Sequence, residues 1–149
     1  MRIIGFNFTK VAAEKSPKFQ LGTNINTDIE FTNIEKEETD LAKDGSDVLK
    51  ISFKFSVLYR DKDEKNIKDS SKGEISLLGF VVLLASSEES KEILKDWKKK
   101  ELSNAFKVPI FNFILKKSSV RAMQLEEELN LPLHVPMPQI KSGKSEEKK

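Results

Sequence analysis

The segment from Leu49 to Tyr59 constrains the fold more than any other part of the sequence. Apolar residues occupy every second position, and lysine or serine occupies four of the positions between them. Successive side chains of a β-strand point to opposite faces, so this alternation gives one apolar and one polar face. The β-branched and aromatic content favours the same assignment. The pattern predicts a long antiparallel strand whose apolar face carries Leu49, Ile51, Phe53, Phe55, Val57 and Tyr59.

Three further stretches have strand-like patterns, at about residues 2–11, 24–36 and 73–84. The connections between them are polar, and Gly45 suits a turn position with positive φ. The acidic connection 35–47 lacks the regular spacing of a calcium-binding loop, so we expect a solvated loop there. Together the four stretches predict a four-stranded antiparallel sheet.

Two helices follow the strands in the sequence. Ser86 and Glu89 have the spacing of a capping box at the start of the first helix. The second helix is predicted over about residues 108–129, with Pro109 in its first turn and Asn130 at its end. Apolar residues recur at three- and four-residue steps in both helices, which predicts that both pack on one face of the sheet.

The region after the helices is extended rather than helical, because prolines interrupt it at positions 132, 136 and 138. Residues 141–149 are charged and contain serine and glycine, so we expect this tail to be disordered. The predicted architecture is a single α+β domain over residues 1–140, consisting of the sheet, the two helices and a Pro-rich extended segment.

Composition excludes several classes of protein. The 149 residues contain no cysteine, which excludes disulfides, thiolate metal sites and cysteine nucleophiles. Charged residues make up 34% of the chain with a net charge of only +2, which is typical of thermophile surfaces and not of a nucleic-acid-binding protein. The apolar run 77–85 is too short to cross a membrane, and no signal peptide is recognised. We expect a soluble, cytoplasmic protein.

The sequence contains no recognisable catalytic, cofactor-binding or metal-binding motif. His134 is the single histidine, and no serine or aspartate constellation is evident around it in the sequence. Carboxylate pairs are frequent, but they lie in polar loops or on helix faces. We therefore expect a protein that is not an enzyme and that needs neither cofactor nor metal.

Apolar residues at positions expected to be wet are the candidates for a binding surface. The strand 73–84 is apolar on both faces, so its second face is buried or meets a partner. The loop residues Phe19 and Leu21 either tuck under the sheet edge or line a binding surface. The apolar residues of the extended segment alternate, which indicates that it lies along an apolar surface. The candidate partner-binding residues are Phe19, Leu21, Leu78, Phe80, Val82, Leu131, Leu133, Val135 and Met137.

The order of four strands, two helices and a Pro-rich segment resembles the SecB-type export chaperones over about residues 2–140. Three groups of residues carry the resemblance. The first is an aromatic strand from Ile4 to Phe8, followed by Glu14 and a proline-containing break, and the second is a Gly-led strand from Gly73 to Leu84 with an internal Gly79. The third is Pro109-Ile110-Phe111 together with the later Leu131-Pro132-Leu133-His134-Val135-Pro136.

The resemblance implies an ATP-independent holdase that forms dimers or tetramers and holds unfolded proteins or preproteins in apolar grooves. The balanced charge and the short apolar run 77–85 separately predict no nucleic-acid partner and no membrane insertion. Bacterial SecB proteins are strongly acidic and dock on the SecA translocation motor, whereas this chain is nearly neutral and places Lys50 and Lys54 on the polar sheet face. A more general chaperone, or a SecB-like protein of an archaeon, fits the resemblance as well.

Two other functions remain open from the sequence. The chain could be an adaptor that binds one folded partner through strand 73–84 or segment 131–138. It could also be a small-molecule binding domain with a pocket between sheet and helices, which convergent polar groups in a cavity would favour.

Overall fold

The computed structural model describes residues 1–20, 22–40, 45–60 and 71–142. The strands have the order β1-β4-β3-β2 in one antiparallel sheet, so β1 and β2 form its edges. The predicted α+β fold with two C-terminal helices is confirmed. Its elements are β1 (Arg2–Lys15), β2 (Asn24–Glu37), β3 (Ser46–Arg60), β4 (Ser71–Ser86), α1 (Ser87–Lys99) and α2 (Asn104–Leu129).

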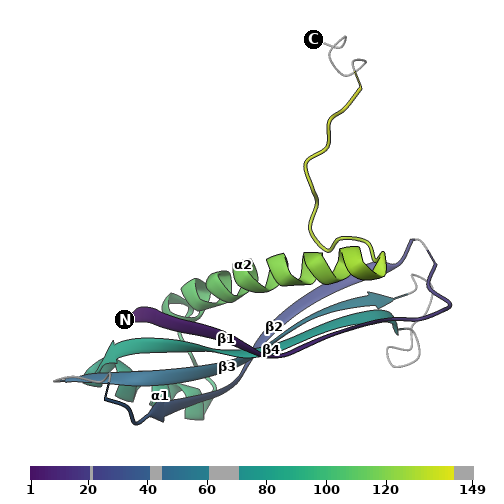
Figure 1. The fold of residues 1–149 in the computed structure, drawn as a ribbon. Coiled ribbons are helices and arrows are strands. Elements are labelled where there is room, and N and C mark those ends of the chain that lie inside the picture. The colour runs from purple at the N-terminus through teal and green to yellow at the C-terminus, as the bar shows by residue number, and fades with distance from the viewer. Residues whose placement is uncertain (21, 41–44, 61–70, 143–149) are drawn as a thin grey trace.

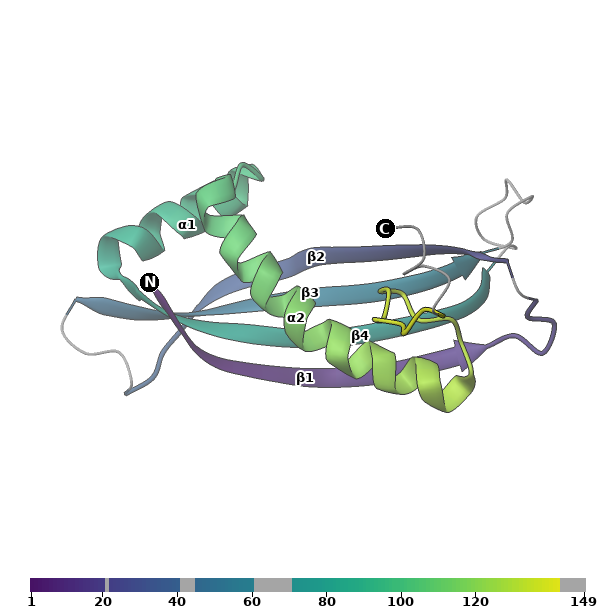
Figure 2. The same cartoon turned by 90° about the horizontal axis from the view of Figure 1, so that it is seen from above.

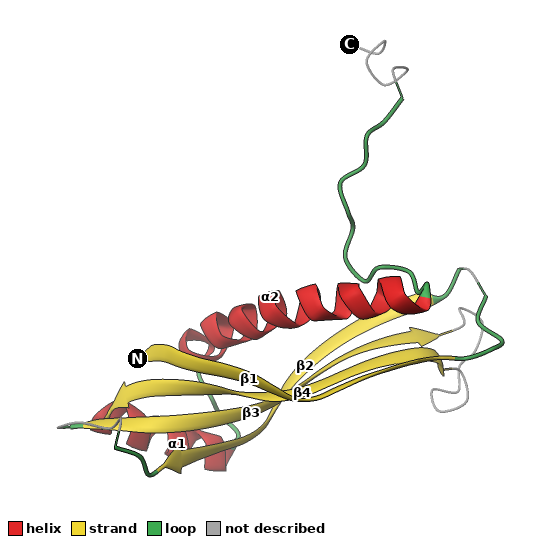
Figure 3. Ribbon diagram, viewed as in Figure 1, coloured by secondary structure: helices red, strands yellow, loops and turns green. Residues whose placement is uncertain are grey.

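The sheet is long and strongly twisted (Figure 1, Figure 3), and both helices pack into one apolar cluster with its inner side chains. Seen from above, α2 runs obliquely across the sheet, while α1 lies near one end of β2 (Figure 2). The backbone of α1 lies closest to β2, β3 and β4, whereas the backbone of α2 lies closest to β1, β3 and β4 and reaches β2 through aromatic side chains. Part of the inner face near β2 therefore lies beside α2 rather than under it.

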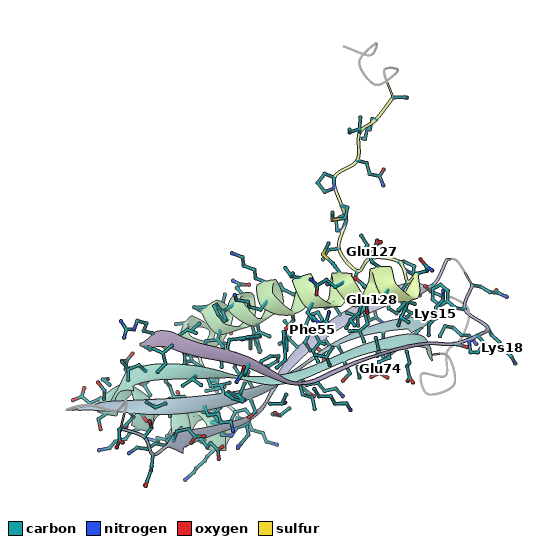
Figure 4. All side chains as sticks on the ribbon, viewed as in Figure 1. Lys15, Lys18, Phe55, Glu74, Glu127 and Glu128 are labelled. Atoms are coloured by element: carbon teal, nitrogen blue, oxygen red, sulfur yellow. The ribbon has the colours of Figure 1, made fainter. Side chains whose placement is uncertain are left out.

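The alternation that predicted β3 is confirmed. In Figure 4, Phe55 of β3 lies between the sheet and α2, whereas Glu74 of β4 projects from the opposite face. Lys50 and Lys54 are paired across the sheet with Val82 and Leu78, which places them on that outer face. The inner row of β3 is almost completely buried and consists of Leu49, Ile51, Phe53, Phe55, Val57 and Tyr59.

Gly79 makes room for the largest inner side chain near the middle of the sheet. It is paired with Phe53 on β3 and Phe8 on β1. A Cβ atom at Gly79 would lie 2.3 Å from the Asn7 carbonyl oxygen and 2.9 Å from Cζ of Phe53. The ring of Phe53 occupies this space and stacks on Phe6 with 5.5 Å between ring centroids. The missing side chain thus allows an aromatic cluster to form against the sheet.

The strands are longer than the sequence predicted. β1 continues beyond the predicted end at residue 11, because Ala12 and Lys15 pair with Ser76 and Gly73. The predicted loop 35–47 is shorter for the same reason, since β2 extends to Glu37 and β3 begins at Ser46. Gly45 has a φ of 77°, which confirms its predicted turn conformation. Pairing between strands thus includes polar stretches in the sheet that the side-chain pattern alone predicts to be loops.

The start of α1 is confirmed. The Ser86 hydroxyl accepts a hydrogen bond from the Glu89 backbone N–H at 3.1 Å, and the Glu89 carboxylate accepts one from the Ser86 N–H at 3.1 Å. The backbone N–H of Ser86, and after it the Ser86 side chain, hydrogen-bond to the Glu89 carboxylate and lower its pKa. The cap therefore contributes stability at neutral pH that is lost as the pH falls through this lowered pKa.

The predicted start of α2 at residue 108 was wrong. The helix begins at Asn104, because the Ser103 hydroxyl accepts a hydrogen bond from the Phe106 N–H at 3.3 Å. Pro109 consequently lies inside the helix rather than in its first turn. A proline cannot donate the bond that the carbonyl four residues earlier would receive. That carbonyl belongs to Ala105, an exposed residue, so water can satisfy it.

The end of α2 at Asn130 is confirmed. Asn130 is left-handed with a φ of 53°, and the Leu131 N–H donates to the Glu126 carbonyl oxygen at 2.8 Å. This closure turns the chain back over the sheet before residues 136–142 extend away from it (Figure 1). Within the described ranges, no helix has both the length and the apolar character needed to cross a membrane.

Candidate functional site

A largely apolar pocket of about 630 Å³ lies at the β2 edge, and we call it the edge pocket. Three elements meet there: β2, the end of α1 with the connection that follows it, and the first half of α2. Its lining residues are Ile29, Glu30, Phe31, Trp97, Lys98, Lys100, Leu102, Lys107 and Phe111.

Aromatic residues form the floor of the edge pocket. Phe31 of β2 stacks on Phe111 of α2 with 4.4 Å between ring centroids, and it also contacts Phe106 at 6.4 Å. Phe106 is buried, whereas Phe31, Phe111 and Trp97 keep part of their surface exposed. Large, rigid, partly exposed rings are the side chains that contribute most to protein recognition. The pocket is therefore suited to apolar side chains of a partner.

The backbone beside the edge pocket is also available for recognition. β2 is the last strand of the sheet, so among the described residues no strand pairs with its outer side. An unpaired edge offers N–H and C=O groups to an added extended chain. A segment bound there would have its backbone on β2 and alternate side chains in the pocket.

None of the eight predicted partner-binding residues that the structure describes lines the edge pocket. Phe19 is half-buried and packs edge-on against Tyr59 at 6.1 Å, while Lys15 lies 5.3 Å from the Phe19 ring centroid. Of the two alternatives for this loop, tucking under the sheet edge thus describes Phe19. Leu21 lies outside the described residues.

The outer row of β4 is where the sequence placed it, on the face opposite the helices. Leu78, Phe80 and Val82 are half-buried, and Lys50 lies 4.6 Å from the Phe80 ring centroid. A depression of about 450 Å³ includes Leu78 and Phe80 in its lining. This outer row is separate from the edge pocket and makes a second apolar surface.

The extended segment divides into an attached and a projecting part. Leu131 is buried in the core at 5% exposure, and Leu133 and Val135 are half-buried. Met137 is 52% exposed and lies beyond the point where the chain leaves the sheet. The prediction that the segment lies along apolar surface therefore holds up to about residue 135. The tail was expected to be disordered, and its residues 143–149 lie outside the described part of the chain.

The sequence contains a signal that the sheet does not cover α2 completely. The apolar positions of α2 are too many for one buried stripe, since Leu115, Val108 and Val120 remain 39%, 50% and 58% exposed. A stripe wider than a sheet can cover leaves one flank open. The position of the open flank depends on the oblique path of α2, which periodicity does not specify.

A buried polar cluster connects β3, α2 and the extended segment. Glu126, completely buried, accepts hydrogen bonds from the Tyr59 hydroxyl and from the His134 N–H, the latter at 3.1 Å. Nδ1 of His134 lies 2.9 Å from the same carboxylate, and Nε2 lies 3.2 Å from the Ser119 hydroxyl. The sequence suggested no such constellation because its members are distant along the chain.

Tyr59 serves as a neutral donor in this cluster. Burial raises the pKa of Tyr59 far above its ordinary value, and the neighbouring Glu126 carboxylate raises it further. Its hydroxyl also lies 2.7 Å from the Pro132 carbonyl oxygen. The cluster thus binds both the backbone and the imidazole of the extended segment to the core.

Ser119, His134 and Glu126 contact one another in the arrangement that a catalytic nucleophile, its base and an orienting carboxylate adopt. Two features favour a structural role. The His134 side chain is only 1% exposed. Ser119 lies in the middle of α2, where backbone N–H groups are engaged within the helix and offer no oxyanion hole. Among the described residues no cluster of histidine and carboxylate side chains suits a metal ion.

Comparison with known proteins gives a structural similarity and no sequence family. No protein-family model and no curated protein matches the chain. Among solved structures, the chain is similar to a SecB-like chaperone from Mycobacterium tuberculosis, determined in complex with a ChAD peptide from the HigA1 antitoxin. The identity is 14% and the TM-score is 0.49, over 95% of this chain and 91% of that chain.

Proposed function

We propose that this protein is an ATP-independent holdase that binds extended segments of unfolded proteins in the edge pocket, without catalysing a reaction. The observation that supports this proposal is a partly exposed aromatic floor beside an unpaired strand edge. The floor offers contacts that depend on apolar content rather than on a particular sequence. The edge offers hydrogen bonds that any extended backbone can make.

The openness of the pocket to the strand edge favours a polymer over a small molecule. Small-ligand sites enclose most of their ligand and hold it with a few convergent polar groups. The polar side chains at the edge pocket are lysines on its rim and Glu30, and the floor is apolar. A chain that passes over the floor and continues beyond the pocket fits this arrangement.

Self-association is part of the proposal, together with a cytoplasmic location. Apolar side chains remain exposed outside the edge pocket, with Val11 at 40% and Ile4 at 38% on β1. Contact between copies would cover such side chains. Light scattering after size exclusion gives the mass, and a dimer or tetramer is the expected result.

Replacing Phe111 by aspartate is expected to abolish protection of an aggregating client, because it removes the stacked aromatic pair and puts a charge on the apolar floor. Wild-type protein should suppress the light scattering of a chemically unfolded client at a stoichiometric ratio without ATP. Val120→Asp is the matched control, since Val120 is exposed on the same helix outside the pocket lining. Circular dichroism shows whether each variant is folded.

Three outcomes oppose the holdase proposal. The wild-type protein could fail to protect any client, Phe111→Asp could protect as well as wild type while folded, or Val120→Asp could lose protection equally. To cover the case in which Phe111→Asp does not fold, Leu102→Glu changes the pocket lining from the connection between the helices, outside both of them. It should give the same loss.

The outer row of β4 favours a second candidate function, an adaptor for one folded partner. Half-buried apolar side chains on an otherwise polar sheet face are typical of a docking surface. Phe80→Asp is expected to abolish capture of that partner and to leave client protection by the edge pocket intact. Loss of client protection by Phe80→Asp, with Phe111→Asp unaffected, would instead transfer the holdase proposal to the outer face.

A further inference from the structure

We infer that the edge pocket selects segments in which acidic residues flank an apolar core, and discriminates against segments with basic flanks. This inference rests on the proposed function and names the class of segment that the same pocket takes. It follows from the charges that surround the apolar floor.

Three lysines line the pocket, and they come from α1, from α2 and from the connection between the two helices. Lys98 is in the last turn of α1, Lys100 is the residue after that helix, and Lys107 is in α2. All three line the pocket. Among the described residues, no carboxylate lies within ion-pair distance of any of them. Their charge is therefore available to a bound segment.

Glu30, the one carboxylate in the lining, does little to balance these cations. It stands between Ile29 and Phe31 on β2 and pairs with Lys54 across the sheet. Side chains alternate along a strand, so the Glu30 side chain points to the outer face with Lys54 while Ile29 and Phe31 face the pocket. The pocket side of β2 is apolar at this point, and the rim is positively charged.

The positive rim of the edge pocket also disfavours binding of the chain's own charged tail there. Residues 141–149 contain four lysines and two glutamates, a net charge of +2. Approach of this tail would add positive charge to a positive rim. The position of the lysines therefore favours an acidic segment of another protein over occupation by the tail.

Charges near a surface are screened by salt, so the selectivity must weaken as ionic strength rises. Each exposed ion pair contributes modestly, and with three lysines we expect about a tenfold difference in affinity between acidic and basic flanks at low salt. The apolar contacts should change little with salt, so a residual affinity common to all flanks should remain.

The test compares three fluorescent peptides with one apolar, aromatic core and flanks of aspartate, serine or lysine. Fluorescence anisotropy with full-length protein gives the dissociation constants at about 0.05 M and about 0.5 M salt. The expected order of affinity at low salt is aspartate, serine, lysine, with the three values converging at high salt. The triple variant Lys98→Gln, Lys100→Gln, Lys107→Gln should remove the order, so that the three peptides bind with equal affinity.

The matched control is Lys91→Gln, Lys95→Gln, Lys116→Gln, which removes three exposed lysines outside the pocket lining. It lowers the net charge equally and should retain the order of affinity. If the serine peptide binds but the lysine peptide binds as tightly as the aspartate peptide, the inference fails and the proposed function stands. The inference also fails if both triple variants lose the order equally. If no peptide binds, the proposed function and the inference fail together.

Discussion

Replacing Glu126 by alanine is expected to lower the free energy of unfolding by about 3–5 kcal/mol, the cost of removing one member of a buried polar pair whose partners stay buried. The carboxylate is completely buried and accepts from the Tyr59 hydroxyl and the His134 N–H. Without it, the backbone N–H and Nδ1 of His134 lose their partner in a place that water reaches poorly. Urea denaturation followed by circular dichroism measures the loss.

Glu127→Ala is the matched control, since Glu127 is the adjacent residue of α2 but is exposed. We expect that variant to change stability by less than about 0.5 kcal/mol. A loss below about 1 kcal/mol for Glu126→Ala would contradict the role assigned to the cluster. The accompanying structural effect is release of residues 131–135 from the sheet, which faster amide hydrogen exchange of that segment would report.

The second large effect is expected at the centre of the sheet. Phe53→Ala should lower the free energy of unfolding by about 3–5 kcal/mol, because it removes a buried ring and leaves a cavity. Phe53 is 1% exposed and contacts Phe6 and Phe8 at ring-centroid distances of 5.5 and 6.4 Å. Gly79, which lies against the Phe53 ring, has no side chain to fill the cavity, so the site should collapse poorly.

Thermal or urea unfolding measures the Phe53→Ala effect, with Phe53→Leu as the conservative comparison that restores part of the volume. We expect Phe53→Leu to lose clearly less stability than Phe53→Ala. Equal losses would mean that the aromatic stacking, rather than the volume, carries the stabilisation. A loss for Phe53→Ala below about 1 kcal/mol would contradict a tightly packed centre.

The fold could be predicted because its signals are local. Alternation from Leu49 to Tyr59 specifies a strand and its buried face in the same pattern, and Ser86 with Glu89 marks a helix start by hydrogen bonds three residues apart. Such features depend on neighbours in the chain. The strand order, with β4 between β1 and β3, depends on long-range pairing and could not be read from the pattern.

The candidate site could not be predicted for a related reason. Phe31 and Phe111 are 80 positions apart in the sequence, and each fits an ordinary core position of its own element. Only the oblique path of α2 leaves both partly uncovered beside the edge strand. The same holds for Tyr59, Glu126 and His134, which meet because the chain reverses at Asn130.

The most direct test of the central claim is to locate a bound client on the protein surface. The chain contains no cysteine, so one cysteine can be introduced and labelled with a photocrosslinker without interference. Val108→Cys places the label on α2 one turn before Phe111, and Asp28→Cys places it on the outer row of β2, paired with Ser56. Mass spectrometry then identifies crosslinks to an unfolded client and to the same client folded.

We expect crosslinks from position 108 to the unfolded client, none from position 28, and none to the folded client from either position. Equal crosslinking from both positions, or crosslinking from position 28 alone, would contradict the assignment of client binding to the edge pocket.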